Sequence, residues 1–129
     1  MLSQARITTM LPVKDMQRAR AFYEGKLGFR PDGGAHVDGR YEYECDGARI
    51  ALIPREGGTK AEHTALSFEV RDIAGRIGEL QRAGVVFEDY DLPGLKTVNH
   101  VCVLGSEKAA WFRDPEGNYL CLHEEADEG

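Results

Sequence analysis

Mainly apolar positions alternate with polar ones in four stretches of the chain, and this period of two predicts strands buried on one face. We expect strands at 6–13, 63–70 and 118–123, with another ending near residue 54. The apolar positions are Ile7, Thr9 and Leu11; Ile50 and Leu52; Thr64, Leu66 and Phe68; Leu120 and Leu122. The opposite faces carry a mixed, partly polar set that suits a cavity lining better than a closed core.

Two stretches change to the helical period. Apolar residues from Met16 to Leu27 and from Ile73 to Leu80 recur at three- and four-residue spacing, which predicts one amphipathic helix in each stretch. Asp15 and Asp72 precede these stretches as N-caps, and Gly28 and Gly84 follow them at the C′ position, which favours glycine.

Turn signals divide the remaining segments. Asp38-Gly39 and Asp46-Gly47 predict three strands within 33–54. In the second half we expect strands at 85–90, somewhere within 97–111, and at 118–123. The run Asp114-Pro115-Glu116-Gly117 predicts a tight turn between the last two. Residues 91–96 are predicted to be a loop, and 97–108 an inserted hairpin or a long rim loop on the functional side.

The chain repeats itself. Val13-Lys14-Asp15-Met16 recurs as Val70-Arg71-Asp72-Ile73, and the pattern of Tyr41–Leu52 recurs as Trp111–Leu122. The sequence therefore predicts an α+β fold of two βαβββ modules, at about 5–55 and 62–125, within one domain over 1–129. The apolar strand faces are expected to pack under the two helices, and the opposite, partly polar faces to line a cavity.

The hairpin turns give the strand register. We assume that the turns at 114–117 and at Asp46-Gly47 each have a three-residue loop with a bulge. Trp111 then lies opposite Cys121 and Arg113 opposite Tyr119. By the repeat, Tyr41 then lies opposite Ala51 and Tyr43 opposite Arg49. Aromatic side chains would then line the walls of the predicted cavity.

Charge and composition limit the kinds of partner and the location that we expect for this protein. The net charge is −6, with acid concentrated in 124–128, which argues against nucleic acid. No segment approaches the roughly 18 apolar residues of a membrane helix, and residues 1–6 lack the apolar core of a secretory signal. Three cysteines without C-x-x-C spacing indicate reduced thiols and a cytoplasmic location.

Two sets of residues together resemble the vicinal oxygen chelate superfamily, which includes glyoxalase I, the bleomycin resistance proteins, the fosfomycin resistance proteins and the extradiol dioxygenases. They are the run Asp15–Tyr23 with Leu27-Gly28-Phe29, and the run Trp111–Asn118. The resemblance implies two βαβββ modules that form a curved mixed sheet around a cup, with the helices on the outer face. It also implies a homodimer, and a divalent metal in the enzymatic members. Fold alone does not settle function.

The resemblance also locates the metal-ligand positions, which fall on Thr8, Ala51, Ala65 and Cys121. A catalytic divalent ion needs about three ligands of His or carboxylate type. We therefore expect no metal and no cofactor, unless a register shifted by two residues brings in His63 or His123. His36 and His100 have no neighbouring carboxylate in the sequence, so we expect both to be surface residues.

Three hypotheses follow. The first is a metal-free small-molecule-binding protein that holds an aromatic or cationic compound in the cup. The second is a divergent lyase, isomerase or dioxygenase, either metal-dependent or metal-free with Arg113, Glu69 or His63. The third is a module that binds another protein. Catalytic residues are not identified, and the expected ligand-binding residues are Thr8, Tyr41, Tyr43, Ala51, His63, Ala65, Trp111, Arg113 and Cys121.

Overall fold

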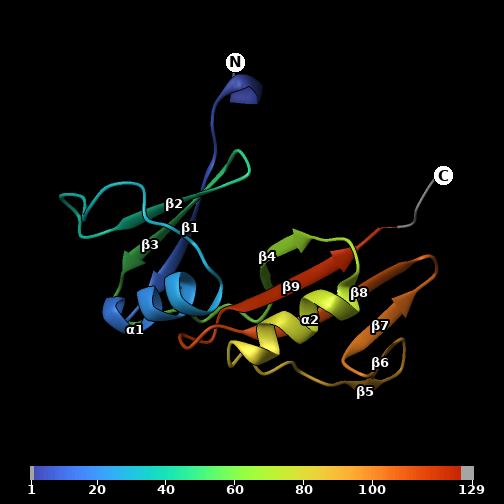
Figure 1. Ribbon diagram of the computed structural model, residues 1–129. Helices are drawn as coiled ribbons and strands as arrows, with labels where there is room; N and C mark the ends of the chain where they lie inside the picture. The colour runs from blue at the N-terminus through green and yellow to red at the C-terminus, as the bar shows by residue number, and fades with distance from the viewer. Residues whose placement is uncertain (1, 126–129) are drawn as a thin grey trace. The chain divides into compact units, whose positions relative to one another are not determined.

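The computed structural model describes residues 2–125, which form two compact units divided between Lys60 and Ala61 (Figure 1). Of the acidic run at 124–128, residues 126–128 lie outside the described part. Each unit combines a mixed sheet with helical structure, so the α+β prediction is confirmed.

Unit 1 is a three-stranded sheet in the order β1-β3-β2, with β1 parallel and β2 antiparallel to β3. The Asp15 carboxylate caps the first helix by accepting a hydrogen bond from the Arg18 N–H at 3.1 Å. The second part of the predicted helix is wound as a π-helix, and Gly28 ends it at φ +79°. The elements are a short 3₁₀-helix (Leu2–Gln4), β1 (Thr8–Val13), α1 (Met16–Arg20), η2 (Ala21–Lys26), β2 (Tyr41–Cys45) and β3 (Ala48–Pro54).

Unit 2 is a six-stranded sheet in the order β4-β9-β8-β7-β6-β5, in which β4 and β9 are parallel and the other neighbours antiparallel. The α2 helix ends in a Schellman motif: the Val85 N–H donates to the Leu80 carbonyl at 2.9 Å and the Gly84 N–H to the Gln81 carbonyl at 3.0 Å. The elements are β4 (Thr64–Glu69), α2 (Ile73–Arg82), β5 (Asp91–Leu92), β6 (Leu95–Val98), β7 (Val101–Leu104), β8 (Glu107–Arg113) and β9 (Tyr119–Glu124).

The internal repeat appears in the pairing. Thr9 and Leu11 of β1 lie beside Ile50 and Leu52 of β3, and Leu66 and Phe68 of β4 lie beside Leu120 and Leu122 of β9. Leu11, Ile50, Leu52, Leu120 and Leu122 are buried, as the alternation predicts. Ile7 and Thr64 are exceptions. Ile7 precedes β1 and is 76% exposed, and Thr64 is exposed beside Tyr119, before a bulge in the β4–β9 pairing.

The strand predicted directly after the helix in each module, within 33–38 and at 85–90, does not form. In unit 1 only an isolated bridge, Pro31↔Tyr43, lies near that place, and in unit 2 only the bridge Phe87↔Phe112. Pro31 lacks an N–H for a ladder and precedes Asp32-Gly33-Gly34, residue types that weaken strands.

The segment 91–108 adds strands instead of a loop. The predicted loop at 91–96 is a short β5–β6 hairpin, turned by Pro93 and by Gly94 at φ +76°. Residues 97–108 take the hairpin alternative, because β6 pairs with β7 and β7 with β8.

The β8–β9 hairpin has the predicted register, with Trp111 opposite Cys121 and Arg113 opposite Tyr119. Its turn is fixed by the buried Asp114, whose Oδ1 accepts from the N–H groups of Glu116 and Asn118, each at 2.9 Å. The Asn118 side-chain amide donates to Oδ2, also at 2.9 Å. These bonds hold the loop in one conformation.

The β2–β3 hairpin is one residue shorter at its turn, so the register predicted there is wrong. Asp46 and Gly47 have φ of +46° and +85°, both in the left-handed region, as in a two-residue type I′ turn. Tyr41 consequently pairs with Leu52 and Tyr43 with Ile50, while Glu42 pairs with Ala51. A one-residue slip exchanges the two faces of a strand, so the tyrosines share the face of Ile50 and Leu52.

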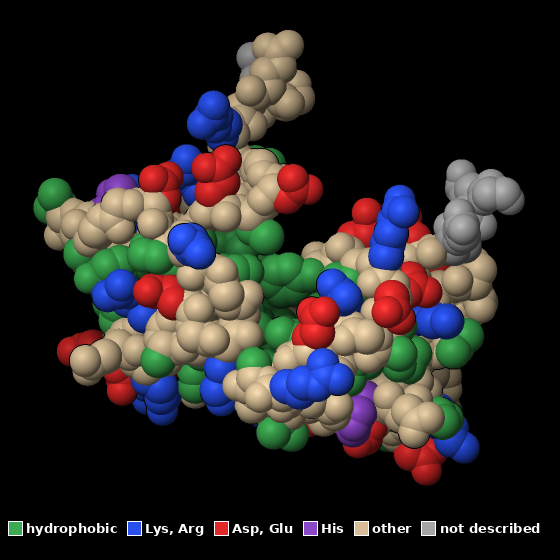
Figure 2. Space-filling view, in the orientation of Figure 1, with side chains coloured by type: hydrophobic (Ala, Val, Ile, Leu, Met, Phe, Trp, Pro, Cys, Tyr) green, Lys and Arg blue, Asp and Glu red, His purple; other side chains and the backbone are tan. Residues whose placement is uncertain are grey.

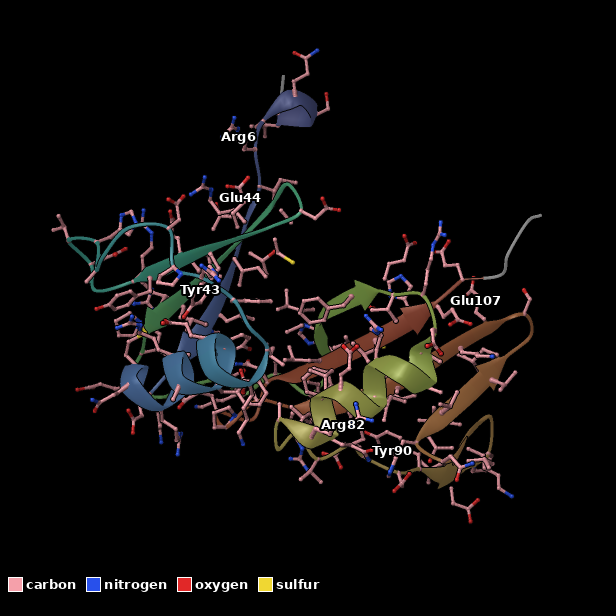
Figure 3. All side chains as sticks on the ribbon, viewed as in Figure 1. Arg6, Tyr43, Glu44, Arg82, Tyr90 and Glu107 are labelled. Atoms are coloured by element: carbon pink, nitrogen blue, oxygen red, sulfur yellow. The ribbon has the colours of Figure 1, made fainter. Side chains whose placement is uncertain are left out.

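Tyr43 belongs to the core of unit 1. Its side chain is fully buried and contacts the rings of Tyr23 and Phe29 at centroid distances of 6.3 and 5.6 Å (labelled in Figure 3). Its hydroxyl donates to Glu24 Oε2 at 2.8 Å, and Arg20 Nε donates to the same oxygen at 2.7 Å. Burial and this carboxylate raise the pKa of Tyr43.

The turn yields a first prediction. Gly47→Ala should lower the free energy of unfolding by about 1–2 kcal/mol, because an L-residue is strained at this φ. No atom lies within 4 Å of the added Cβ, so strain is the only cost. Gly57→Ala is the matched control: it has open space and no positive φ, and should be neutral or slightly stabilising. Urea unfolding measures both, and equal losses would contradict the turn assignment.

The buried tyrosine yields a second prediction. At pH 7, Tyr43→Phe should cost about 1.5–3 kcal/mol, the usual range for a hydrogen bond to a charged group. Burial acts to raise the pKa of Glu24, but the hydrogen bonds from Arg20 and Tyr43 outweigh it and lower that pKa. The stabilisation is therefore present above the ordinary value of 4.5 and is lost as the pH falls through the lowered value.

Tyr41→Phe serves as the control for this experiment. The Tyr41 hydroxyl makes no hydrogen bond within residues 2–125, and its ring, which lies 4.0 Å from the Arg20 guanidinium carbon, is kept in phenylalanine. Urea unfolding at pH 7 and pH 3 should show a loss for Tyr43→Phe that shrinks in acid and no loss for Tyr41→Phe. A loss for Tyr43→Phe that is equal at both pH values would contradict the role of Glu24.

Candidate functional site

The sheet face of unit 2 that carries Cys121 collects most of the candidate chemistry. Side chains of directly paired residues share a face, which places three rows across β4, β9 and β8. The rows are Thr64–Tyr119–Arg113, Ser67–Cys121–Trp111 and Glu69–His123–Ala109.

Three aromatic rings and one ion pair form the first part of this face. Trp111 packs edge-on against Tyr90, labelled in Figure 3, at a centroid distance of 5.7 Å. The Arg113 guanidinium lies 5.1 Å from the centre of the Tyr119 ring, and its Nε donates to Glu88 Oε1 at 2.6 Å. Burial and the nearby Glu88 carboxylate raise the pKa of Tyr90. We call Tyr90, Trp111, Arg113, Tyr119 and Glu88 the aromatic cluster.

A polar group lies on the same sheet face, toward the opposite end of β4 and β9. Ser67 Oγ and His123 Nδ1 are 2.6 Å apart, and His123 Nε2 lies 4.0 Å from Glu69 and 3.9 Å from Glu125. Among the described residues, Glu69, His123 and Glu125 offer ligand atoms within 4.8 Å of one another. All three are at least partly exposed.

Unit 1 has an ion-pair network on the face that carries Ala51. The Glu42 carboxylate is nearly buried and accepts from Arg40 Nε at 3.0 Å and Arg49 Nη1 at 3.2 Å. His36 Nε2 lies 3.5 Å from it. The hydrogen bond from Arg40 lowers the pKa of Glu42.

Glu42 is a residue that the sequence reasoning missed. Asp46-Gly47 is itself the signal that would have found it, because this dipeptide favours a two-residue turn. Such a turn pairs Cys45 with Ala48 and brings Glu42 opposite Ala51.

Some of the predicted site residues lie on the expected sheet face and others do not. Trp111, Arg113 and Cys121 share one face of unit 2, as expected. Tyr41 and Tyr43 lie on the helix side of unit 1, so the geometric reason for placing them in a ligand site was wrong.

Thr8 and Ala65, the implied ligand positions on the first strand of each module, differ in their strand pairing. Thr8 pairs with Arg49 in unit 1, whereas Ala65 is the extra residue of a bulge between Thr64 and Leu66. Thr64, rather than Ala65, therefore lies opposite Tyr119. His63 is exposed and immediately precedes β4.

The four implied ligand positions do not fit a divalent ion. Ala51 and Ala65 end in methyl groups, and Thr8 offers only a hydroxyl. Burial raises the pKa of the Cys121 thiol, which disfavours the thiolate that a metal binds. These residues supply no carboxylate or imidazole.

His36 and His100 each have an acidic side chain nearby in the structure, contrary to the expectation that neither has a neighbouring carboxylate. Besides the contact of His36 with Glu42, His100 Nδ1 lies 2.9 Å from Asp89 Oδ1. The residues of this pair are 11 positions apart, and hydrogen bonds from Thr97 to Asp89 and Tyr90 join their two segments, so local sequence does not reveal the pair.

A pocket at the start of α2 adjoins the polar group around His123, because Glu69 and Glu125 line both. Glu124 Oε1 already accepts the Ile73 N–H at 2.9 Å and so occupies the helix N-terminus. On the face shown in Figure 2, acidic and basic side chains are interspersed around α2. Among residues 2–125, no helix is both long and apolar enough to cross a membrane.

Solved structures of several proteins resemble this chain. A protein from Bacillus anthracis described as of the glyoxalase family is 19% identical over 95% of each chain, with a TM-score of 0.74. The antibiotic-binding protein TnmS3 from Streptomyces sp. is 21% identical over 98% of this chain and 99% of its own, with a TM-score of 0.67.

A third solved structure is a mutant of the fosfomycin resistance protein FosX from Listeria monocytogenes, in complex with Mn(II) and 1S,2S-dihydroxypropylphosphonic acid. It is 15% identical over 95% of this chain and 90% of its own, with a TM-score of 0.69. At these identities the likeness concerns the fold alone.

None of the curated proteins compared with this sequence matches it significantly. A family model does match, over residues 6–122. The chain therefore belongs to the Glyoxalase/Bleomycin resistance protein/Dioxygenase superfamily.

Proposed function

We propose that this protein is a metal-free small-molecule-binding protein of the glyoxalase and bleomycin resistance type, which holds an aromatic or cationic compound. The observation that carries the proposal is the aromatic cluster on the unit 2 sheet. Trp111, Tyr90 and Tyr119 are each partly exposed there rather than sealed in a core. Flat, amphipathic rings at partly exposed positions favour contact with a planar ligand.

The residues at the implied metal positions support the metal-free part of the proposal. Thr8, Ala51, Ala65 and Cys121 lack the imidazole and carboxylate groups that bind a catalytic divalent ion. Trp111, Arg113 and Cys121 are retained as proposed ligand-binding residues, and Thr8, Ala51, His63 and Ala65 as weaker candidates.

A second function is favoured by a different observation. Glu69, His123 and Glu125 together provide one imidazole and two carboxylates within 4.8 Å. This donor set suits a divalent ion, and it would support a metal-dependent lyase, isomerase or dioxygenase of the same superfamily.

We further propose a homodimer, which would cover exposed strand edges, and a cytoplasmic location. Cys45, Cys102 and Cys121 are free cysteines, which supports a reducing compartment.

Metal analysis separates the two functions. The purified, dialysed protein should contain well under one equivalent of zinc, manganese, nickel or iron, as measured by inductively coupled plasma mass spectrometry. One retained equivalent that disappears in His123→Ala or His63→Ala would establish the metal-dependent alternative and overturn the metal-free proposal.

Ligand binding gives a further prediction. A thermal-shift screen of small aromatic and cationic compounds should raise the melting temperature, because a ligand that binds only the folded state stabilises it. Trp111→Ala should weaken binding of a hit several-fold while costing less than the roughly 3–5 kcal/mol expected for a core tryptophan.

Phe112→Ala is the matched control, since Phe112 neighbours Trp111 on β8 but is fully buried. It should show the full core cost in urea unfolding. If Trp111→Ala loses as much stability as Phe112→Ala, or binds the hit as the wild type does, the aromatic cluster is not the binding surface.

A further inference from the structure

The Arg113 side chain is held in a fixed orientation while most of its hydrogen-bonding capacity is unused. Glu88 takes the Nε–H at 2.6 Å and the Tyr119 ring lies against the guanidinium. Neither Nη1 nor Nη2 donates a hydrogen bond to any residue of the described range 2–125, and the Arg113 side chain is 50% exposed. The outer edge of the guanidinium therefore offers two parallel donors.

We propose that Arg113 binds the oxyanion of a planar aromatic ligand, such as an aromatic carboxylate, whose ring packs beside Trp111 and Tyr119. This inference rests on the proposed function and narrows it to one ligand class. A guanidinium edge matches a carboxylate with two parallel hydrogen bonds, which are stronger than neutral ones.

The position of the rings supports the same ligand. Trp111 lies opposite Cys121, and Tyr119 stands two residues before Cys121 on β9, so the indole and the phenol are diagonal neighbours on one sheet face. Diagonal side chains are about 7–8 Å apart, within reach of a single aromatic ring. A ring placed there would have its acidic substituent near Arg113.

A cationic ligand fits this cluster less well. The Arg113 guanidinium already occupies a face of the Tyr119 ring, and its charge repels a second cation. The Glu88 carboxylate, the acid of the cluster, is engaged by Arg113 Nε. A cation would have to displace this ion pair before it could use either group.

Three isosteric probes test the charge preference directly: benzoate, benzamide and benzamidinium. The chain has one tryptophan, so the Trp111 indole N–H gives a single assignable peak in a proton–nitrogen correlation NMR spectrum. Benzoate should shift this peak with an apparent Kd at least about tenfold lower than benzamide, a difference that one charge-assisted interaction supplies, and benzamidinium should bind most weakly.

Two arginine variants locate the effect. Arg113→Gln should abolish the preference for benzoate over benzamide. Arg76→Gln is the matched control, because Arg76 is similarly exposed and also pairs with a glutamate, Glu79, but lies on α2 away from the aromatic cluster. It should leave the preference unchanged. The dispersion of each NMR spectrum shows that the variant is folded.

The outcomes separate this inference from the proposed function. If benzamide or benzamidinium shifts the peak as strongly as benzoate, aromatic binding stands and the oxyanion role of Arg113 is overturned. The role is also overturned if Arg113→Gln keeps the benzoate preference, or if no probe moves the peak while the thermal-shift screen yields a ligand.

Discussion

Strand register is the constraint on which the candidate site depends. Because side chains alternate across a sheet, the number of residues in a hairpin turn decides which of them face the helix. The three-residue loop at 115–117 sends Trp111 and Arg113 away from Leu120 and Leu122, whereas the two-residue turn at Asp46-Gly47 sends Tyr41 and Tyr43 toward the core. One residue of turn length thus makes two otherwise similar hairpins differ in chemistry.

The sequence predicted the features that local physics controls. The caps at Asp15 and Asp72, the helix ends at Gly28 and Gly84, and the paired modules follow from short-range preferences and from the repeat. The β8–β9 register also followed from its turn. These features depend on a few neighbouring residues, so their pattern is visible in the chain.

The wrong predictions have two causes: local signals that were misinterpreted, and contacts that only the folded chain creates. Reasoning by analogy from one hairpin to the other ignored the preference of Asp46-Gly47 for a shorter turn, which misplaced Tyr41 and Tyr43 and hid Glu42. The strand predicted after the helix is reduced to one bridge in each module, and in unit 1 Pro31 and the glycines after it account for this. The contacts of His100 with Asp89 and of His123 with Glu69 depend on folding and have no local signal.

The turn around Asp114 also has an evolutionary consequence. Asp114 and Asn118 carry the hydrogen bonds that hold the β8–β9 loop, and neither of them lies among the partly exposed side chains of the aromatic cluster. Residues 111, 113 and 119 can therefore be exchanged while the hydrogen bonds of this turn stay in place. Because the residues that fix the turn differ from the residues exposed on the sheet face, single substitutions on that face can change the ligand preference while the fold is kept.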